Sequence, residues 1–230
     1  MLGERLRSLF RPPGLPGPVN DSPLRARAAV GPAYRNGRAG DTDRPSNGLR
    51  QFFEAVRGPR LRILDLGGAC QSNINFITSQ GHRLYSEDVL VSVERLASEA
   101  RDNAARGGLS RQFLDECLGF ADQNFDGILV WDTLEFLDED VLQATVARLL
   151  GIIKPGGTLL AFFHTQAKGQ TVPVYRYQIQ SPGTLRLQLR FVRPMPRAFN
   201  NRHLERLFGQ FRSVKFFLAK DGLREVIVTR

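Results

Sequence analysis

The feature that most constrains this sequence is a regular alternation of short apolar runs, glycine turns and helical segments. The first apolar run, residues 62–66, ends at Gly67–Gly68, and a helical pattern follows over 72–80. A second run over 83–88 leads into a helical pattern over 89–106. A strand that ends in a tight turn and is followed by a helix is the repeating unit of parallel sheets. The sequence therefore predicts an α/β fold.

The alternation continues along the chain and changes only near the end. The further expected elements are a helix over 49–56, a weak third strand near 111–114, a fourth strand over 127–131, a helix over 141–153, a turn over 154–157, a fifth strand over 158–163 and a helix over 201–211. Two last apolar runs, 214–219 and 225–229, flank Lys220-Asp221-Gly222, which predicts a β-hairpin. We therefore expect a Rossmann-like, doubly wound, mostly parallel seven-stranded sheet with a C-terminal antiparallel hairpin strand.

Two segments depart from this pattern. Residues 1–50 contain 7 of the 13 prolines and show no sustained hydrophobic period. We expect a disordered basic tail there, with a short amphipathic helix over 2–10 as an alternative. Residues 51–230 form the expected folded domain. Within it, 171–199 is an insertion with a hairpin around 181–184, placed beyond a strand's carboxyl end, where open α/β sheets bind ligands.

Composition and charge narrow the class of protein. Hydrophobic residues make up 42% of the chain, which supports a core and excludes wholesale disorder. Cys70 and Cys117 suit neither a disulfide scaffold nor a four-thiolate zinc site, so we expect free thiols in a reducing, cytoplasmic compartment. No apolar run approaches the roughly 20 residues of a membrane span. Positive charge is concentrated late in the chain, where residues 171–212 hold 8 arginines and 1 acid.

Four motifs occur in an order that carries a resemblance to a known family. They are Ile63-Leu64-Asp65-Leu66-Gly67-Gly68, the acid Asp88 placed 23 residues after Asp65, the segment Phe125-Asp126-Gly127-Ile128-Leu129-Val130-Trp131-Asp132-Thr133-Leu134-Glu135-Phe136-Leu137, and the turn Ile153-Lys154-Pro155-Gly156-Gly157-Thr158-Leu159. From about residue 50 to 230 the chain resembles the class I S-adenosylmethionine (SAM) dependent methyltransferases of the type-11 kind. The resemblance implies SAM as the cofactor and methyl transfer as the activity.

The resemblance also assigns cofactor contacts to particular residues. These are Asp65, Gly67, Gly68, Asp88 and Trp131. Glycine lets the backbone approach a ligand closely, and the two oxygens of Asp88 can accept hydrogen bonds from vicinal ribose hydroxyls. Two alternatives stay open. Asp65 could be a buried acid that binds turn amides, and a register slip of one residue would put Glu87 in the place of Asp88.

Asp132 and His164 follow the fourth and end the fifth expected strand, and they are the candidate catalytic bases for an acceptor that must lose a proton. The remaining histidines, His82 and His203, lie far away in sequence, so we expect no metal site. The arginines of the basic segment either face water or bind an anionic acceptor. They are Arg176, Arg186, Arg190, Arg193 and Arg197. A small-molecule or lipid-like acceptor is favoured over nucleic acid, because no aromatic stacking platform is interleaved with the basic residues.

Three positions depart from the family pattern. Ala69 and Gln71 stand where the family has its later glycines, and Phe136 replaces a histidine. We expect the Gln71 side chain to project where the backbone otherwise approaches the cofactor. A second hypothesis follows from these departures, namely a non-catalytic binding or scaffold protein of the same fold.

Overall fold

The computed structural model describes residues 41–102 and 108–230. Its main sheet has six strands in the order β3-β2-β4-β5-β9-β8. Their bounds are β2 Arg62–Asp65, β3 Arg83–Ser86, β4 Phe125–Trp131, β5 Ile153–His164, β8 Ser213–Leu218 and β9 Leu223–Thr229. Strands β3, β2, β4 and β5 run parallel, whereas β9 is antiparallel to both β5 and β8. This arrangement confirms the expected α/β class, with a mostly parallel sheet and a C-terminal hairpin.

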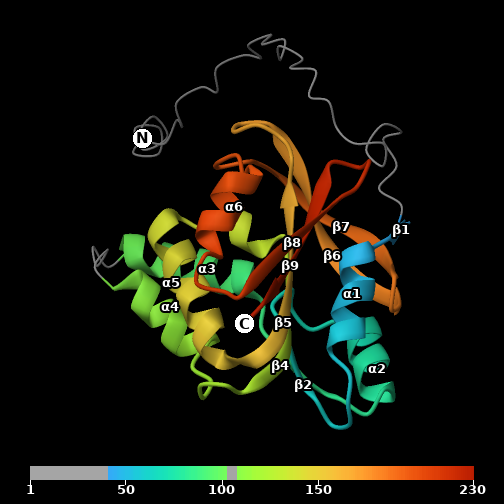
Figure 1. Ribbon diagram of the computed structural model, residues 1–230. Helices are drawn as coiled ribbons and strands as arrows, with labels where there is room; N and C mark the ends of the chain where they lie inside the picture. The colour runs from blue at the N-terminus through green and yellow to red at the C-terminus, as the bar shows by residue number, and fades with distance from the viewer. Residues whose placement is uncertain (1–40, 103–107) are drawn as a thin grey trace, which may run out of the picture.

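Helices cover both faces of this sheet (Figure 1). Those on one face are α3 Val89–Asp102, α4 Leu109–Cys117, α5 Glu139–Ile152 and α6 Asn201–Leu207, and those on the other are α1 Asn47–Ala55 and α2 Gln71–Ser79. The central strands β4 and β5 are buried along most of their length, which explains their continuous apolar runs. Their carboxyl ends, at Trp131 and His164, therefore open onto one edge of the sheet.

The structure corrects two elements that the sequence predicted. The weak third strand expected near 111–114 is part of α4, so the main sheet has six strands and not seven. Phe113 and Cys117 are both buried at a spacing of four residues, which is the period of a helix. The turn expected over 154–157 lies inside β5 as an irregularity, where the pairing with β4 shifts register between Ile153 and Thr158.

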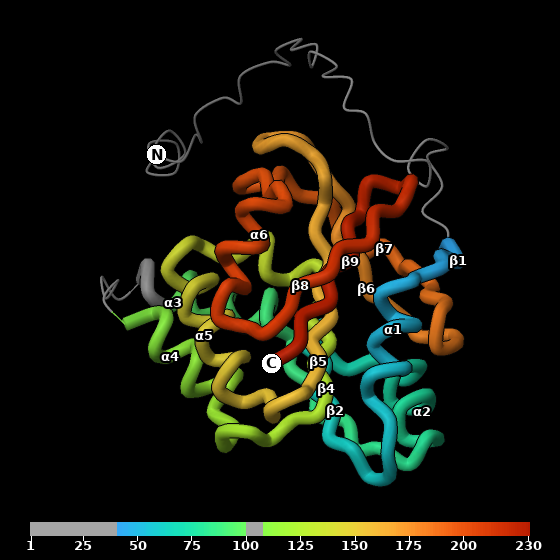
Figure 2. Tube along the Cα trace, viewed as in Figure 1, coloured from blue at the N-terminus to red at the C-terminus, as the bar shows by residue number. Residues whose placement is uncertain are grey.

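A second, three-stranded sheet has the order β1-β7-β6. It consists of β1 Thr42–Pro45, β6 Thr171–Ser181 and β7 Thr184–Pro194, all antiparallel to their neighbours. Figure 2 shows β1 beside β7, although the two are far apart in sequence. The hairpin expected around 181–184 is thus present, and its two long strands carry the inserted segment.

The boundary of the expected tail needs correction. Residues 42–50 form β1 and the start of α1, and they are not a disordered segment. Arg44 and Ser46 are buried, and the Ser46 hydroxyl caps α1 by accepting a hydrogen bond from the Leu49 amide at 3.0 Å. The amphipathic segment expected over 2–10 lies outside the described residues.

Two further expectations can be compared directly with the structure. Cys70 and Cys117 are free thiols, as predicted, and both are buried. Within the part of the chain that the structure describes, no helix has the length and apolar character needed to cross a membrane.

Candidate functional site

Asp65 ends β2 at the glycine turn, and its carboxylate is bound entirely by the protein's own donors. Its Oδ1 accepts hydrogen bonds from the Gly67 amide at 3.0 Å and from the Trp131 indole Nε1 at 2.6 Å. Its Oδ2 accepts from the Asn73 side-chain amide at 2.9 Å. Burial raises the pKa of Asp65, and these three donors partly oppose that rise. Asp65 therefore does what the alternative reading expected of it, as a buried acid that satisfies a turn amide.

Trp131 ends β4 and lies against the glycine turn. Its φ of +57° is in the left-handed region, which large side chains rarely adopt. A Cβ atom on Gly67 would lie only 2.6 Å from the indole Cδ1. The indole is 1% exposed and stacks on Tyr177 of β6, with ring centroids 5.1 Å apart and planes 3° apart. The open side of Gly67 is thus covered by the indole.

Asp88 follows β3 and lies against the second glycine of the turn. A Cβ atom on Gly68, whose φ is +85°, would lie 2.7 Å from Asp88 Oδ2. That same oxygen accepts a hydrogen bond at 2.9 Å from the Arg190 guanidinium, which comes from β7. Asp88 Oδ1 accepts from the Val91 amide at 3.2 Å, in the first turn of α3. Both oxygens of the expected ribose acid therefore have partners within the protein.

The competing acid Glu87 contributes its backbone to the same turn. Its carbonyl oxygen accepts from the Gly68 amide at 3.0 Å, and its amide donates to the Asp65 carbonyl at 2.9 Å. Burial raises the pKa of the Glu87 carboxyl. The carboxylate that faces Gly68 is that of Asp88 and not that of Glu87.

The β6–β7 hairpin is fastened to the start of α2 beside this turn. The Asn73 side chain donates to the Tyr177 carbonyl at 3.0 Å and accepts from the Ile179 amide at 2.8 Å. The Ser72 hydroxyl donates to the Ile179 carbonyl at 2.9 Å. Tyr177, Ile179 and Leu185 are buried in the same apolar cluster as α1 and β5. The hairpin is therefore part of the core rather than a loose flap.

We tested whether these residues fit the SAM that the resemblance implies. A glycine turn receives a ligand when its Cα atoms face open space, but here Gly67 faces Trp131 and Gly68 faces Asp88. In this arrangement the residues of the turn do not fit SAM. We call this feature the closed glycine turn, made of Gly67, Gly68, Asp88 and Trp131.

The departures noted in the sequence are not what closes the turn. The Gln71 side chain does not project into the turn, so the expectation from the sequence was wrong. Its side chain is exposed and donates to the Asn75 side-chain oxygen at 2.7 Å along α2. Ala69 is exposed, and its φ is not in the positive region. The groups that close the turn are instead Trp131 at the end of β4 and Asp88 after β3, two residues that the resemblance had assigned to the cofactor.

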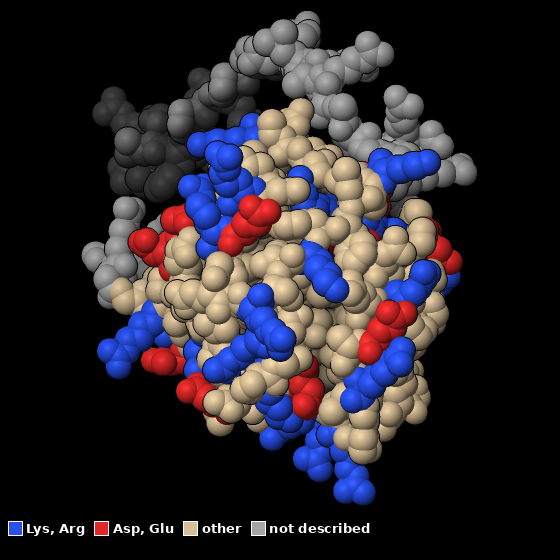
Figure 3. Space-filling view, in the orientation of Figure 1, with Lys and Arg blue, Asp and Glu red and all other residues tan. Residues whose placement is uncertain are grey.

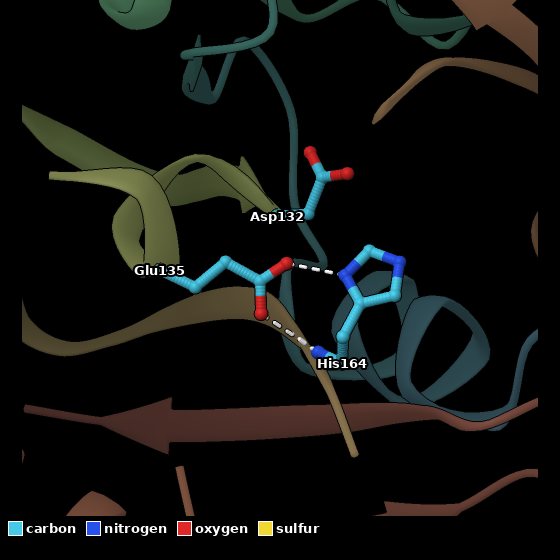
Figure 4. Close-up of side chains that lie close together, drawn as sticks. All are labelled: Asp132, Glu135 and His164. Carbon is cyan, nitrogen blue, oxygen red and sulfur yellow. Dashed lines mark hydrogen bonds and ion pairs between the residues drawn. The ribbon is translucent and has the colours of Figure 1, made fainter. Parts of the chain in front are cut away.

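Beside the turn, Asp132, Glu135 and His164 form a buried cluster (Figure 4). Asp132 follows β4, Glu135 lies on the short 3₁₀ helix η2 Thr133–Phe136, and His164 ends β5. Glu135 Oε1 pairs with His164 Nδ1, and Glu135 Oε2 accepts from the His164 amide at 2.7 Å. Asp132 Oδ2 accepts from the Tyr177 hydroxyl at 3.0 Å. The two expected catalytic residues are thus close together, with a carboxylate that holds the imidazole in place.

Burial dominates the electrostatics of this cluster. It raises the pKa of Asp132 to about 7, although the nearby His164 and the Tyr177 hydroxyl favour the charged form. Burial also disfavours a charged His164, but Glu135 outweighs this effect, so the pKa of His164 is raised. The pKa of Tyr177 is raised well above its ordinary value, first by burial and then by Asp132. The cluster therefore holds protons that exposed groups would release at neutral pH.

Four of the five arginines named in the basic segment form ion pairs with acidic residues of the same chain. They form ion pairs with Asp43, Asp88, Glu94 and Glu139, through Arg186, Arg190, Arg193 and Arg197 respectively. On the face shown in Figure 3, basic side chains lie among acidic ones. The arginines of the basic segment thus complement the acids of the neighbouring elements. An anionic acceptor would have to compete with those acids.

The assignments of cofactor and catalytic residues remain predictions. The structure brings Asp65, Gly67 and Trp131 into contact, places Gly68 against Asp88, and puts Asp132 near His164. Sequence reasoning missed Asn73, Glu135 and Tyr177, and it named Arg190 for an anionic acceptor and not as the partner of Asp88. The three-residue spacing of Asp132 and Glu135 was a readable signal, because one turn of 3₁₀ helix puts both on the same side. The hairpin residues gave no such signal.

No family model matches the sequence, and no curated protein matches it. Similar solved structures include Burkholderia thailandensis 1,6-didemethyltoxoflavin-N1-methyltransferase with bound 1,6-didemethyltoxoflavin and S-adenosylhomocysteine, at 16% identity, covering 80% of this chain and 76% of that one, with a TM-score of 0.43. They also include SAM-dependent methyltransferases from Archaeoglobus fulgidus (13% identity, 79% and 91% covered, TM-score 0.45) and Clostridium acetobutylicum (11%, 79% and 90%, 0.46).

The strand order and the antiparallel β9 are those of a Rossmann-like α/β fold with a mostly parallel sheet. All three TM-scores are below 0.5 and all identities below 25%, so nothing about the activity, cofactor or acceptor of this chain rests on them.

Proposed function

We propose that this chain is a non-catalytic binding or scaffold protein with a methyltransferase-like fold. In this proposal the chain does not bind SAM at its glycine turn. The observation that carries the proposal is the position of Trp131. Its indole covers Gly67, donates to the buried Asp65 and stacks on Tyr177. The space that a nucleoside would need beside the turn is taken by the protein's own aromatic rings.

Opening the turn has a substantial free-energy cost. Exposing a buried aromatic side chain costs about 1.5–3 kcal/mol. Removing the indole donor from the buried Asp65 carboxylate costs on the order of 1–3 kcal/mol more. Asp88 would also have to exchange Arg190 for the ligand. Because each 1.4 kcal/mol lowers affinity about tenfold, these costs weaken SAM binding by several orders of magnitude.

Methyl transfer to a small-molecule or lipid-like acceptor is the second candidate function. The observation that favours it is the buried pair of Glu135 and His164 beside Asp132. A carboxylate that holds one imidazole nitrogen fixes the tautomer and leaves the other nitrogen for proton transfer. This arrangement suits the removal of a proton from an acceptor, but a closed glycine turn gives it no methyl donor.

Calorimetric titration with S-adenosylhomocysteine (SAH) separates the two candidates. We expect no saturable heat for the wild type at millimolar ligand. Saturable binding by the wild type that is lost in Asp88→Ala would overturn the proposal in favour of methyl transfer.

Paired variants test the stated cause. Arg190→Ala frees the Asp88 carboxylate, and adding Trp131→Ala uncovers Gly67, so we expect the double variant to gain measurable SAH binding. Arg186→Ala is the matched control, since it removes an arginine of the same strand that pairs with Asp43 instead. A gain of binding in the control equal to that in the double variant would show that the turn is not what blocks the ligand.

A further inference from the structure

The buried cluster of Asp132, Glu135 and His164 has the composition of a metal site. Each residue offers one ligand atom, and these three atoms lie within 4.8 Å of one another. They come from the carboxyl ends of β4 and β5 and from η2, so the sheet edge fixes their relative positions (Figure 4). Asp65, Gly67, Gly68 and Asp88 take no part in the cluster. We propose that Asp132, Glu135 and His164 bind one divalent transition-metal ion.

The balance of charge supports a cation at this place. Asp132 is 1% exposed, Glu135 0% and His164 4%. Among the residues that the structure describes, no lysine or arginine forms an ion pair with Asp132 or Glu135. Two buried carboxylates therefore share one imidazole as their only basic partner. Buried charges of one sign are costly unless they are paired or ligate a metal, and a divalent ion would balance both carboxylates.

The donor set indicates which metals would bind. One imidazole nitrogen and two carboxylate oxygens suit Zn²⁺, Mn²⁺, Fe²⁺ or Co²⁺, whereas Mg²⁺ and Ca²⁺ prefer oxygen ligands alone. Three protein ligands leave at least one position on the metal for water or substrate. The Tyr177 hydroxyl donates a hydrogen bond to Asp132 and would thereby orient the Asp132 carboxylate from outside the coordination sphere. Binding requires a lone pair on the ring nitrogen that ligates, so a charged His164 would release one proton to solvent as the metal binds.

The sequence predicted no metal because its histidines are far apart. The ligands stand at positions 132, 135 and 164, and only the parallel pairing of β4 with β5 brings the last of them near the first two. Spacing rules for metal sites detect ligands on one local element, so they miss a site assembled from two strand ends.

The test is a titration of the full-length, metal-free protein with Co²⁺, followed by its visible absorption. We expect one equivalent to bind and to give a ligand-field band, and Zn²⁺ to displace it. Glu135→Gln and His164→Asn should each weaken Co²⁺ binding by at least about tenfold, because losing even a residue that only orients a metal ligand typically costs that much. The variant His203→Gln, which changes a half-buried histidine of α6 outside the cluster, is the matched control and should bind as the wild type does.

A wild type that shows no ligand-field band and no rise in melting temperature with Zn²⁺ or Mn²⁺ would overturn the proposal. So would a band that persists in both ligand variants or vanishes in the control. If the ligand variants fail to fold, X-ray absorption of the Zn²⁺-loaded wild type decides: we expect a first shell of nitrogen and oxygen atoms without sulfur and the outer-shell scattering of one imidazole, and a spectrum without imidazole scattering would overturn the proposal. The Co²⁺ titration contains no SAH. A failure of the metal proposal is therefore distinguishable from a failure of the proposal that the glycine turn does not bind SAM.

Discussion

Trp131 has a left-handed backbone conformation that places its indole back over the turn that follows β2. Such a conformation costs on the order of 1–3 kcal/mol for a large residue and persists only where the surroundings hold it. Here the Asp65 carboxylate and the Tyr177 ring hold it on two sides. The contacts that hold the strained backbone of Trp131 are therefore the same contacts that keep its indole over Gly67.

Asp132 gives a pH dependence with a definite sign. Burial raises its pKa from 3.8 to about 7, so between these values the folded chain keeps a proton that the unfolded chain releases. Its contribution to stability is therefore present at low pH and is lost as the pH rises through about 7. The raised pKa of His164 acts in the same direction.

The variant Asp132→Asn removes the titration at this position. We expect the free energy of unfolding of the variant, relative to wild type, to increase by on the order of 1–4 kcal/mol between about pH 5 and about pH 8. Urea denaturation in the presence of a chelator measures this difference. An equal difference at both pH values would contradict the assignment of a raised pKa to Asp132.

At the residue scale the sequence indicated where chemistry-bearing groups lie but not what they contact. Asp65, Asp88, Asp132 and His164 all follow or end apolar runs, and strand ends meet at one edge of a parallel sheet. Their partners Arg190 and Tyr177 come from the insertion, whose register over the sheet no local pattern specifies. The closing of the turn could therefore not be read from the motif.

At the element scale, the buried Asn73 side chain of α2 makes more hydrogen bonds to the β6–β7 hairpin and the glycine turn than its neighbour Ser72 does. Asn73 is 1% exposed and joins Asp65 to the backbone of β6 through three hydrogen bonds. The helix α2 and the hairpin are thereby held in register beside the glycine turn.

Replacing Asn73 by alanine leaves buried partners without their hydrogen bonds. We expect Asn73→Ala to lower the free energy of unfolding by about 2–4 kcal/mol, since each unsatisfied buried group costs on the order of 1–3 kcal/mol. The control Asn75→Ala changes an exposed residue of the same helix and should stay within about 0.5 kcal/mol of wild type. Chemical denaturation measures both, and equal effects would show that Asn73 does not anchor the hairpin.

Most elements were predictable from periodicity, and the exceptions have physical causes. β4 and β5 are continuous apolar runs because both faces of the sheet are covered, so they were recognised easily. The strand predicted near 111–114 was wrong because a short apolar run suits a strand or a helix equally. Phe113 and Cys117 are four residues apart and both buried, which is the pattern of a helix with one face on the core.

At the scale of the whole molecule, the start of the folded region is tied to its end. Arg44 of β1 is 5% exposed and pairs with Glu225 of β9, which is 2% exposed. Glu225 also accepts hydrogen bonds from the Ser46 hydroxyl and the Gly48 amide at the beginning of α1. Residues 42–48 therefore complete the buried polar network of β9.

Two deletions test this connection. Removing residues 1–40 leaves every contact described above in place, so we expect the melting temperature to change little. Removing residues 1–48 leaves Glu225 buried without its partners, which costs about 3–5 kcal/mol and lowers the melting temperature by on the order of 10 °C. Calorimetry or circular dichroism measures both, and equal melting temperatures would contradict a role for β1.

The closed glycine turn can be tested directly because Trp131 is the only tryptophan in the chain. Its fluorescence therefore reports on the one indole that covers Gly67. The buried, stacked indole should emit at short wavelength and resist quenching by acrylamide, and millimolar SAH should change neither property. An indole that is exposed to acrylamide in the free protein, or that shifts its emission to longer wavelength as SAH is added, would contradict the account.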